Sequence, residues 1–222
     1  HHADVAALRS VDGLMALYGV PERDWPAMTA LVTERFHYVG WPKAVGLDDG
    51  HVIDLGGVSV TLIHAPGHTA GHSVYLIESA EGRVLVTGDI DLSSFGPYYG
   101  DAASSLDDFE ATLQRVRAIV ADQYVTFHHK GVVHGHEAFA AAVDAYATVI
   151  ARRHQHLLQL LEHRRTFDEL VQEGIVYRPG TRPAVFGESV ERYTIGRHLD
   201  RALADSSASA DEHHYWRTEV SG

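Results

Sequence analysis

Three residues that bind metal ions well, His68, Asp89 and His128, each follow a short apolar segment of the chain. Two imidazoles and one carboxylate suit Zn, Fe or Mn better than Ca or Mg, which prefer oxygen ligands. Gly67 and Gly88 directly precede the first two of these residues. Because glycine has no side chain, the backbone there can pass close to an ion. The three residues therefore predict a transition-metal site.

The apolar segments before these residues are typical of strands. Apolar and polar residues alternate over 58–62, and short apolar runs follow at 74–77, 84–86 and 124–127. In α/β folds, ligands bind in the loops outside the carboxyl ends of strands. Strands that end at one edge of a sheet can therefore bring together residues that lie far apart in sequence.

Helical patterns surround this strand region. Apolar spacing predicts a helix over 5–18, which Gly19 ends, and a second helix over 27–36. Further helices are predicted over 107–120, 139–161, 166–173 and 190–204, the third of these beginning with a capping box. We expect residues 206–210, which are rich in Ser and Ala, to be frayed.

One nine-residue segment, Ala65-Pro66-Gly67-His68-Thr69-Ala70-Gly71-His72-Ser73, resembles the Pro-Gly-His-Thr-x-Gly-His element of the metallo-β-lactamase superfamily. Thr87-Gly88-Asp89 resembles the Gly-Asp element of that family, and Phe127-His128 its final Gly-His; the likeness covers about residues 50 to 136. The resemblance implies that His68 binds a first metal, that Asp89 bridges two metals and that His128 binds the second. It implies one or two Zn ions, with Fe or Mn as alternatives. We expect His72 to support the ligands or the fold rather than to bind the metal.

Two departures from the family pattern affect the ligand set. The family hallmark His-x-His-x-Asp-His is absent, and the nearest text, His2-Ala3-Asp4-Val5, has valine where a ligand should stand. We interpret residues 1–18 as the strand end and helix that follow this hallmark, and expect an upstream segment to hold up to four further ligands. Phe127 replaces the glycine before the final His, which leaves His129 as an alternative to His128.

The predicted fold is α/β. Residues 1–135 resemble the core of an αββα metallo-β-lactamase sandwich that is incomplete at its N-terminus. Residues 136–222 form a long helix and a helical, winged-helix-like module, as in subfamilies that carry such an appendage after the core. This division predicts two domains with the metal site in the first.

The resemblance implies a metal-dependent hydrolase, similar to hydroxyacylglutathione hydrolases, that cleaves an ester-like bond such as a thioester or lactone in a small molecule. A bound cation lowers the pKa of water to about 7 and so supplies hydroxide at neutral pH. Asp89 would orient this nucleophile. Two other readings stay open: a catalytically incomplete chain that binds partners through its C-terminal module, and a mononuclear iron enzyme that uses His68, Asp89 and His128.

Composition narrows the function classes. Lys and Arg number 18 against 30 Asp and Glu, and the net charge is −12 with neutral His. This acidity disfavours nucleic acid and an anionic membrane surface as partners, because their phosphates are repelled. The chain has no Cys, which excludes disulfides and thiolate metal sites. We expect a cytoplasmic protein that acts on a small molecule, with the C-terminal helices as a surface for a homodimer.

Overall fold

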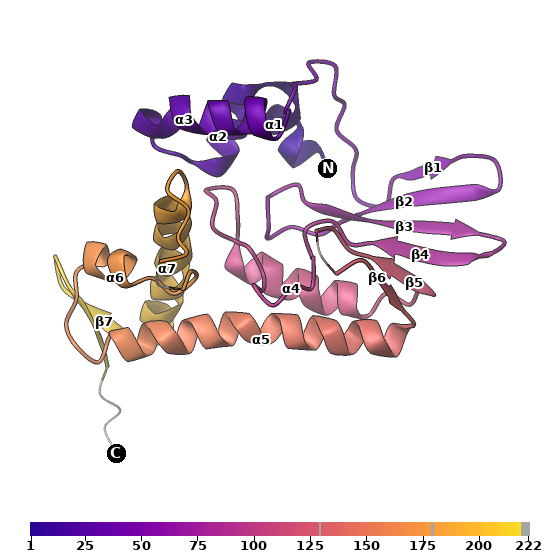
Figure 1. Ribbon diagram of the computed structural model, residues 1–222. Helices are drawn as coiled ribbons and strands as arrows, with labels where there is room; N and C mark the ends of the chain where they lie inside the picture. Colours follow the sequence, from indigo (N-terminus) through magenta and orange to yellow (C-terminus); the bar gives the residue numbers. More distant parts are fainter. Residues whose placement is uncertain (129, 179, 219–222) are drawn as a thin grey trace. The chain divides into compact units, whose positions relative to one another are not determined.

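The computed structural model describes residues 1–128, 130–178 and 180–218 of the 222-residue chain. The chain forms two compact units, one of residues His1–Val149 and one that begins at Ile150 (Figure 1). The division falls between Val149 and Ile150, within the long helix, and the two domains of residues 1–135 and 136–222 stay a prediction. None of the helices in the described residues combines the length and the apolarity that crossing a bilayer requires.

The first unit opens with short helices. They are η1 (His2–Asp4), α1 (Val5–Arg9), α2 (Val11–Tyr18), η2 (Glu22–Asp24), α3 (Trp25–Ala30) and the π-helical turn η3 (Leu31–Arg35). The single helix predicted over 5–18 is wrong, because Ser10 adopts an extended backbone and its hydroxyl accepts a hydrogen bond from the Gly13 amide. Gly19 ends α2, as the sequence predicted, and the structure shows it in the left-handed conformation.

A six-stranded sheet follows, with its strands in chain order from β1 to β6. The strands are β1 (Val52–Asp54), β2 (Val58–His64), β3 (Ser73–Ser79), β4 (Gly82–Val86), β5 (Gln123–Val125) and β6 (Val132–His134). Neighbouring strands are antiparallel except β4 and β5, which are parallel. The parallel pair needs a crossover connection, and helix α4 (Leu106–Arg117) lies in it. The sequence analysis did not predict β6.

One face of the sheet is covered by α4 and by the first part of α5 (His136–Leu160) (Figure 1). Leu85 and Tyr124 on this face are fully buried, and the Tyr124 ring stacks on that of Phe139 with centroids 3.7 Å apart. The opposite face carries a row of paired apolar residues that is only partly covered, of which Ile77 and Val84 are the central pair. The described residues thus supply one sheet, with helices on one of its sides, of the expected sandwich.

The second unit holds the end of α5, α6 (Phe167–Glu173), α7 (Gly187–Ala204) and a hairpin of β7 (Ala208–Ala210) and β8 (Tyr215–Arg217). The predicted capping box is confirmed, since Thr166 and Glu169 hydrogen-bond each other's backbone. The frayed tail predicted over 206–210 is wrong, because backbone pairing with β8 orders it. The core of this unit consists of apolar residues from the three helices, from the segments that follow α5 and α6, and from the hairpin: Leu157, Leu158, Leu161, Leu170, Val171, Ile175, Ile195, Leu199, Ala202 and Ala208.

Candidate metal centre

The strand directions place three loops at one edge of the sheet. Strands β2 and β4 are both antiparallel to β3, and β5 is parallel to β4, so β2, β4 and β5 run the same way. Their carboxyl ends therefore lie at the same edge. His68 comes from the loop after β2, Asp89 from the loop after β4 and His128 from the loop after β5. The topology brings together the three residues that the sequence singled out.

The loop of His68 is packed tightly against α4. Gly67 has φ +128°, and a side chain there would place Cβ 2.3 Å from the Cα of Phe109. Only glycine fits this approach and this backbone conformation. The Ser104 hydroxyl donates to the His68 carbonyl oxygen at 2.7 Å and fixes the backbone of the ligand candidate itself.

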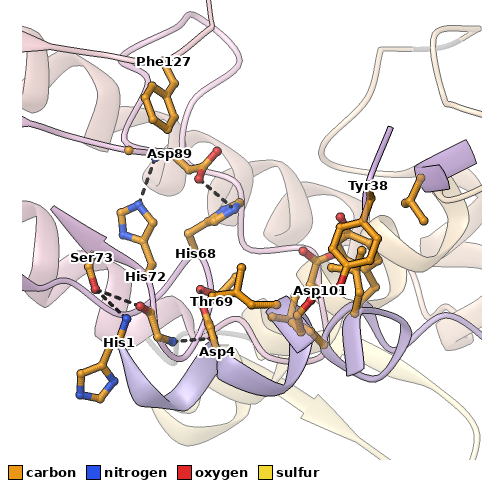
Figure 2. Close-up of a pocket in the computed structure, with 18 of the residues that line it drawn as sticks. His1, Asp4, Tyr38, His68, Thr69, His72, Ser73, Asp89, Asp101 and Phe127 are labelled. Carbon is orange, nitrogen blue, oxygen red and sulfur yellow. Dashed lines mark hydrogen bonds and ion pairs between the residues drawn. The ribbon is translucent and has the colours of Figure 1, made fainter. Parts of the chain in front are cut away.

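The His68 ring is oriented by a backbone carbonyl. Its Nδ1 lies 3.0 Å from the carbonyl oxygen of Tyr98, which can only accept, so Nδ1 carries the proton and donates it. The lone pair is then on Nε2, which lies 3.8 Å from Oδ2 of Asp89 (Figure 2). A carbonyl that fixes the tautomer of an imidazole in this way is typical of metal-binding histidines.

His128 approaches the same carboxylate from its other oxygen. Its Nε2 lies 3.4 Å from Oδ1 of Asp89. Side-chain exposure rises from 18% at His68 through 37% at Asp89 to 56% at His128, so the group opens to solvent on one side. Each imidazole thus faces a different oxygen of Asp89, which suits a carboxylate shared by two ions.

The donor set fits a transition metal. Ligand atoms around a tetrahedral Zn, with bonds of about 2.0–2.1 Å, lie about 3.3 Å apart. The separations of 3.4 and 3.8 Å at Asp89 are close to this value. Imidazole nitrogens and a carboxylate are also the ligands that Zn, Mn and Fe take in proteins.

His72 positions Asp89 through the backbone, and both of its ring nitrogens contact backbone groups. Its Nδ1 donates to the carbonyl of Ala65 at 2.8 Å, and its Nε2 accepts the backbone N–H of Asp89 at 3.0 Å (Figure 2). Burial lowers the pKa of His72, and the neighbouring charge of His68 lowers it further. The neutral ring is the form that can accept from the Asp89 amide, so burial favours the state that holds the loop.

Asp4 supports the same loop from the N-terminal helices, a role the sequence analysis missed. Its carboxylate accepts hydrogen bonds from the Thr69 hydroxyl and from the Gly71 amide, the latter at 2.8 Å. These partners of Asp4 are more than 60 residues away in sequence. The local sequence feature that could have drawn attention to Asp4 is the likeness of residues 2–5 to the family hallmark.

Other histidines of the first unit have different partners. His64 contacts the Ala70 carbonyl through Nε2 at 2.8 Å and stacks on His1, so these two partners are distinct from Asp89. His129, the alternative to His128, lies outside the described residues. Among the described residues, the group whose potential ligand atoms all lie within 4.8 Å of one another is the more exposed one of His1, His2 and Asp48. His68 and His128 each approach Asp89, at different oxygens, and do not form such a group with it.

The chain belongs to the metallo-beta-lactamase superfamily, whose family model matches residues 1–136. Members of this superfamily are generally metal-dependent hydrolases. A crystal structure of the metallo-beta-lactamase family protein TTHA1429 from Thermus thermophilus has a TM-score of 0.65 at 21% identity. The alignment covers 89% of this chain and 64% of that one, and it shows the fold.

Curated relatives agree with this assignment. The chain is 28% identical over 145 residues to the Beta-lactamase-like protein 2 homolog of Caenorhabditis elegans, covering 65% of this chain and 43% of the relative. It is 34% identical over 76 residues to the Probable polyketide biosynthesis zinc-dependent hydrolase BaeB of Bacillus velezensis, covering 34% of this chain and 32% of that protein. The chain therefore spans less than half the length of these two relatives.

Proposed function

We propose that this chain hydrolyses an ester-like bond, a thioester or a lactone, in a small molecule, with zinc held by His68, Asp89 and His128. One observation carries the proposal: two imidazoles from separate loops face the two oxygens of one carboxylate, at 3.8 and 3.4 Å. The zinc-dependent hydrolase among the relatives supports the choice of metal and reaction class.

The chain's own residues would prepare the centre. A bound zinc supplies Lewis acidity and lowers the pKa of water to about 7. His68 presents Nε2 because Tyr98 holds the proton on Nδ1. Asp89 offers both oxygens, and its backbone is fixed by His72. The fixed tautomer and the fixed loop reduce the reorganisation needed when a ligand binds.

A chelation and substitution experiment tests this function. The chain is assayed with a panel of thioesters and lactones after treatment with EDTA, and again after zinc is restored. We expect zinc to restore turnover, and Asp89→Asn to lower it by at least a hundredfold. The matched control is Asp91→Asn, because the Asp91 carboxylate accepts from the Ser93 amide instead of facing a histidine; this variant should stay within twofold of the wild type.

Three outcomes would contradict the proposal. They are turnover that survives chelation, an Asp89→Asn variant as active as the wild type, and a zinc-loaded chain that cleaves neither bond type. The small-molecule substrate, the cytoplasmic location and a homodimer through the C-terminal helices are expectations that accompany this function.

A further inference from the structure

A pocket of about 560 Å³ adjoins the metal centre in the first unit. Its polar end includes His68, His72 and Asp89. Figure 2 shows Tyr38 and Asp101 at a distance from these three, on the far side of Thr69. This volume is within the range of small-molecule sites, about 300–1,000 Å³.

Side chains of the N-terminal helices form most of the wall away from the metal centre, and these are largely apolar, with Asp101 beside Tyr38 as the acidic exception (Figure 2). Residues of α2, η3 and the segment after it form this wall: Leu14, Leu17, Tyr18, Val32, Phe36 and Tyr38. Within this wall, Val32 is buried, at 2% exposed, whereas Phe36 lies at the surface and is 63% exposed. An apolar wall of this kind favours hydrocarbon over a solvated polar group.

Three carboxylates lie along the pocket. Asp4, Asp89 and Asp101 line it, and none of the described residues that line it is Lys or Arg. The pKa of the Tyr18 hydroxyl is raised by burial and then by the charges of Asp101 and Asp89. Burial disfavours a second anion beside Tyr18 in the same way, and the charges of Asp101 and Asp89 disfavour it further.

We propose that this pocket receives an uncharged, apolar acyl or alkyl group, so that the substrates are neutral aliphatic thioesters or lactones. This inference rests on the proposed function for the position of the reacting bond. In the reaction, the bond from the acyl carbon to sulfur or oxygen breaks, a bond from that carbon to a water oxygen forms, and a water proton passes to the leaving group. The pocket contributes by holding the hydrocarbon chain of the substrate.

Burial of hydrocarbon gives the proposal a magnitude. Each buried methylene contributes about 0.8 kcal/mol, which corresponds to about a fourfold gain in affinity. Two additional methylenes should therefore tighten binding about sixteenfold until the pocket is full.

A binding experiment tests the pocket without requiring turnover. Hexanamide, octanamide and octanesulfonate are titrated calorimetrically into the full chain without added zinc, so that Asp89 keeps its charge. The amides are neutral and lack the ester-like bond, and the sulfonate adds a negative charge to the same eight-carbon chain. We expect octanamide to bind about sixteenfold more tightly than hexanamide, and at least tenfold more tightly than the sulfonate.

Two variants locate the binding. Leu17→Ala and Phe36→Ala should each weaken octanamide binding at least fivefold, and Phe36 is exposed enough that its removal leaves folding intact. The matched control is Leu55→Ala, because Leu55 is 65% exposed and lies outside the pocket. Equal affinity for the two amides, equal affinity for amide and sulfonate, or wild-type binding by Phe36→Ala would overturn the inference. Chain-length dependence without hydrolysis would refute the proposed function alone.

Discussion

A buried histidine should make the second unit sensitive to acid. His198 of α7 is 0% exposed, and its Nδ1 lies 3.2 Å from Nδ1 of His154 on α5. Such a bond needs one protonated and one free nitrogen, so the pair cannot persist when both rings are charged. Burial, followed by the charges of His154, Arg201 and Arg153, lowers the pKa of His198 to about 3.

The sign of the effect follows from this lowered pKa. In the unfolded chain His198 binds a proton below its ordinary pKa of 6.5, whereas in the folded unit it stays neutral down to about 3. The free energy of unfolding should therefore fall as the pH decreases from about 6.5 towards 3. Since each pKa unit is worth about 1.4 kcal/mol, the loss from this one group between about pH 7 and about pH 4.5 is about 2 to 3 kcal/mol.

Hydrogen exchange measures this loss in the free energy of unfolding. Exchange of the α7 peptide is followed by mass spectrometry at the two pH values and corrected for intrinsic rates. His198→Gln removes the titrating group. Between the two pH values, the protection of α7 in this variant should therefore fall by about 2 to 3 kcal/mol less than in the wild type. His156→Gln is the matched control, because His156 is an exposed histidine of α5 and should leave the wild-type pH dependence unchanged. The same acid loss in the His198→Gln variant would refute the reasoning.

Two further predictions concern the loops at the metal centre. Gly67→Ala should cause both backbone strain at a positive φ and a clash with the backbone of α4, whereas Gly57→Ala should cause only the strain, since nothing lies within 4 Å of its Cβ. Thermal unfolding should show that the Gly67 variant loses at least about 2 kcal/mol more of its free energy of unfolding than the Gly57 variant. Equal losses would disprove the close packing of Gly67 against α4. His72→Leu leaves the Asp89 amide without its acceptor and should weaken zinc binding about 10- to 100-fold in calorimetric titration. His64→Leu is the control and should change the zinc affinity less than twofold. Equal zinc affinities of the two variants would show that His72 does not support the metal centre.

The strands and the metal loops could be predicted because their signals are local. Alternating apolar residues predicted β2, and short apolar runs predicted β3, β4 and β5. Their convergence could be inferred because a helix between β4 and β5 is long enough for a parallel crossover. Residues 68, 89 and 128 then had to lie at one edge.

The features that were missed depend on contacts that hydrophobic spacing along the chain does not show. Ser10 followed by Asp12 is a helix-start signal, but the break between α1 and α2 also depends on Gly13, which approaches the Ala6 carbonyl. The support that Asp4 gives to the loop of His68 depends on contacts made only in the folded chain.

The C-terminal hairpin was missed for another reason. The Ser- and Ala-rich composition of 206–210 suggested fraying, but strand pairing uses backbone groups that every residue type carries. The stronger signal lay in its partner, Tyr215-Trp216-Arg217, because aromatic residues favour strands.

The most direct test of the metal centre is to find which histidines bind the ion. Co²⁺, a paramagnetic substitute for zinc, is added in substoichiometric amounts to the chain, and the imidazole resonances are followed by NMR. The account predicts that the signals of His68 and His128 shift or broaden first, and that Asp89→Asn weakens this effect. Changes confined to His1 and His2, the exposed group at Asp48, would contradict it.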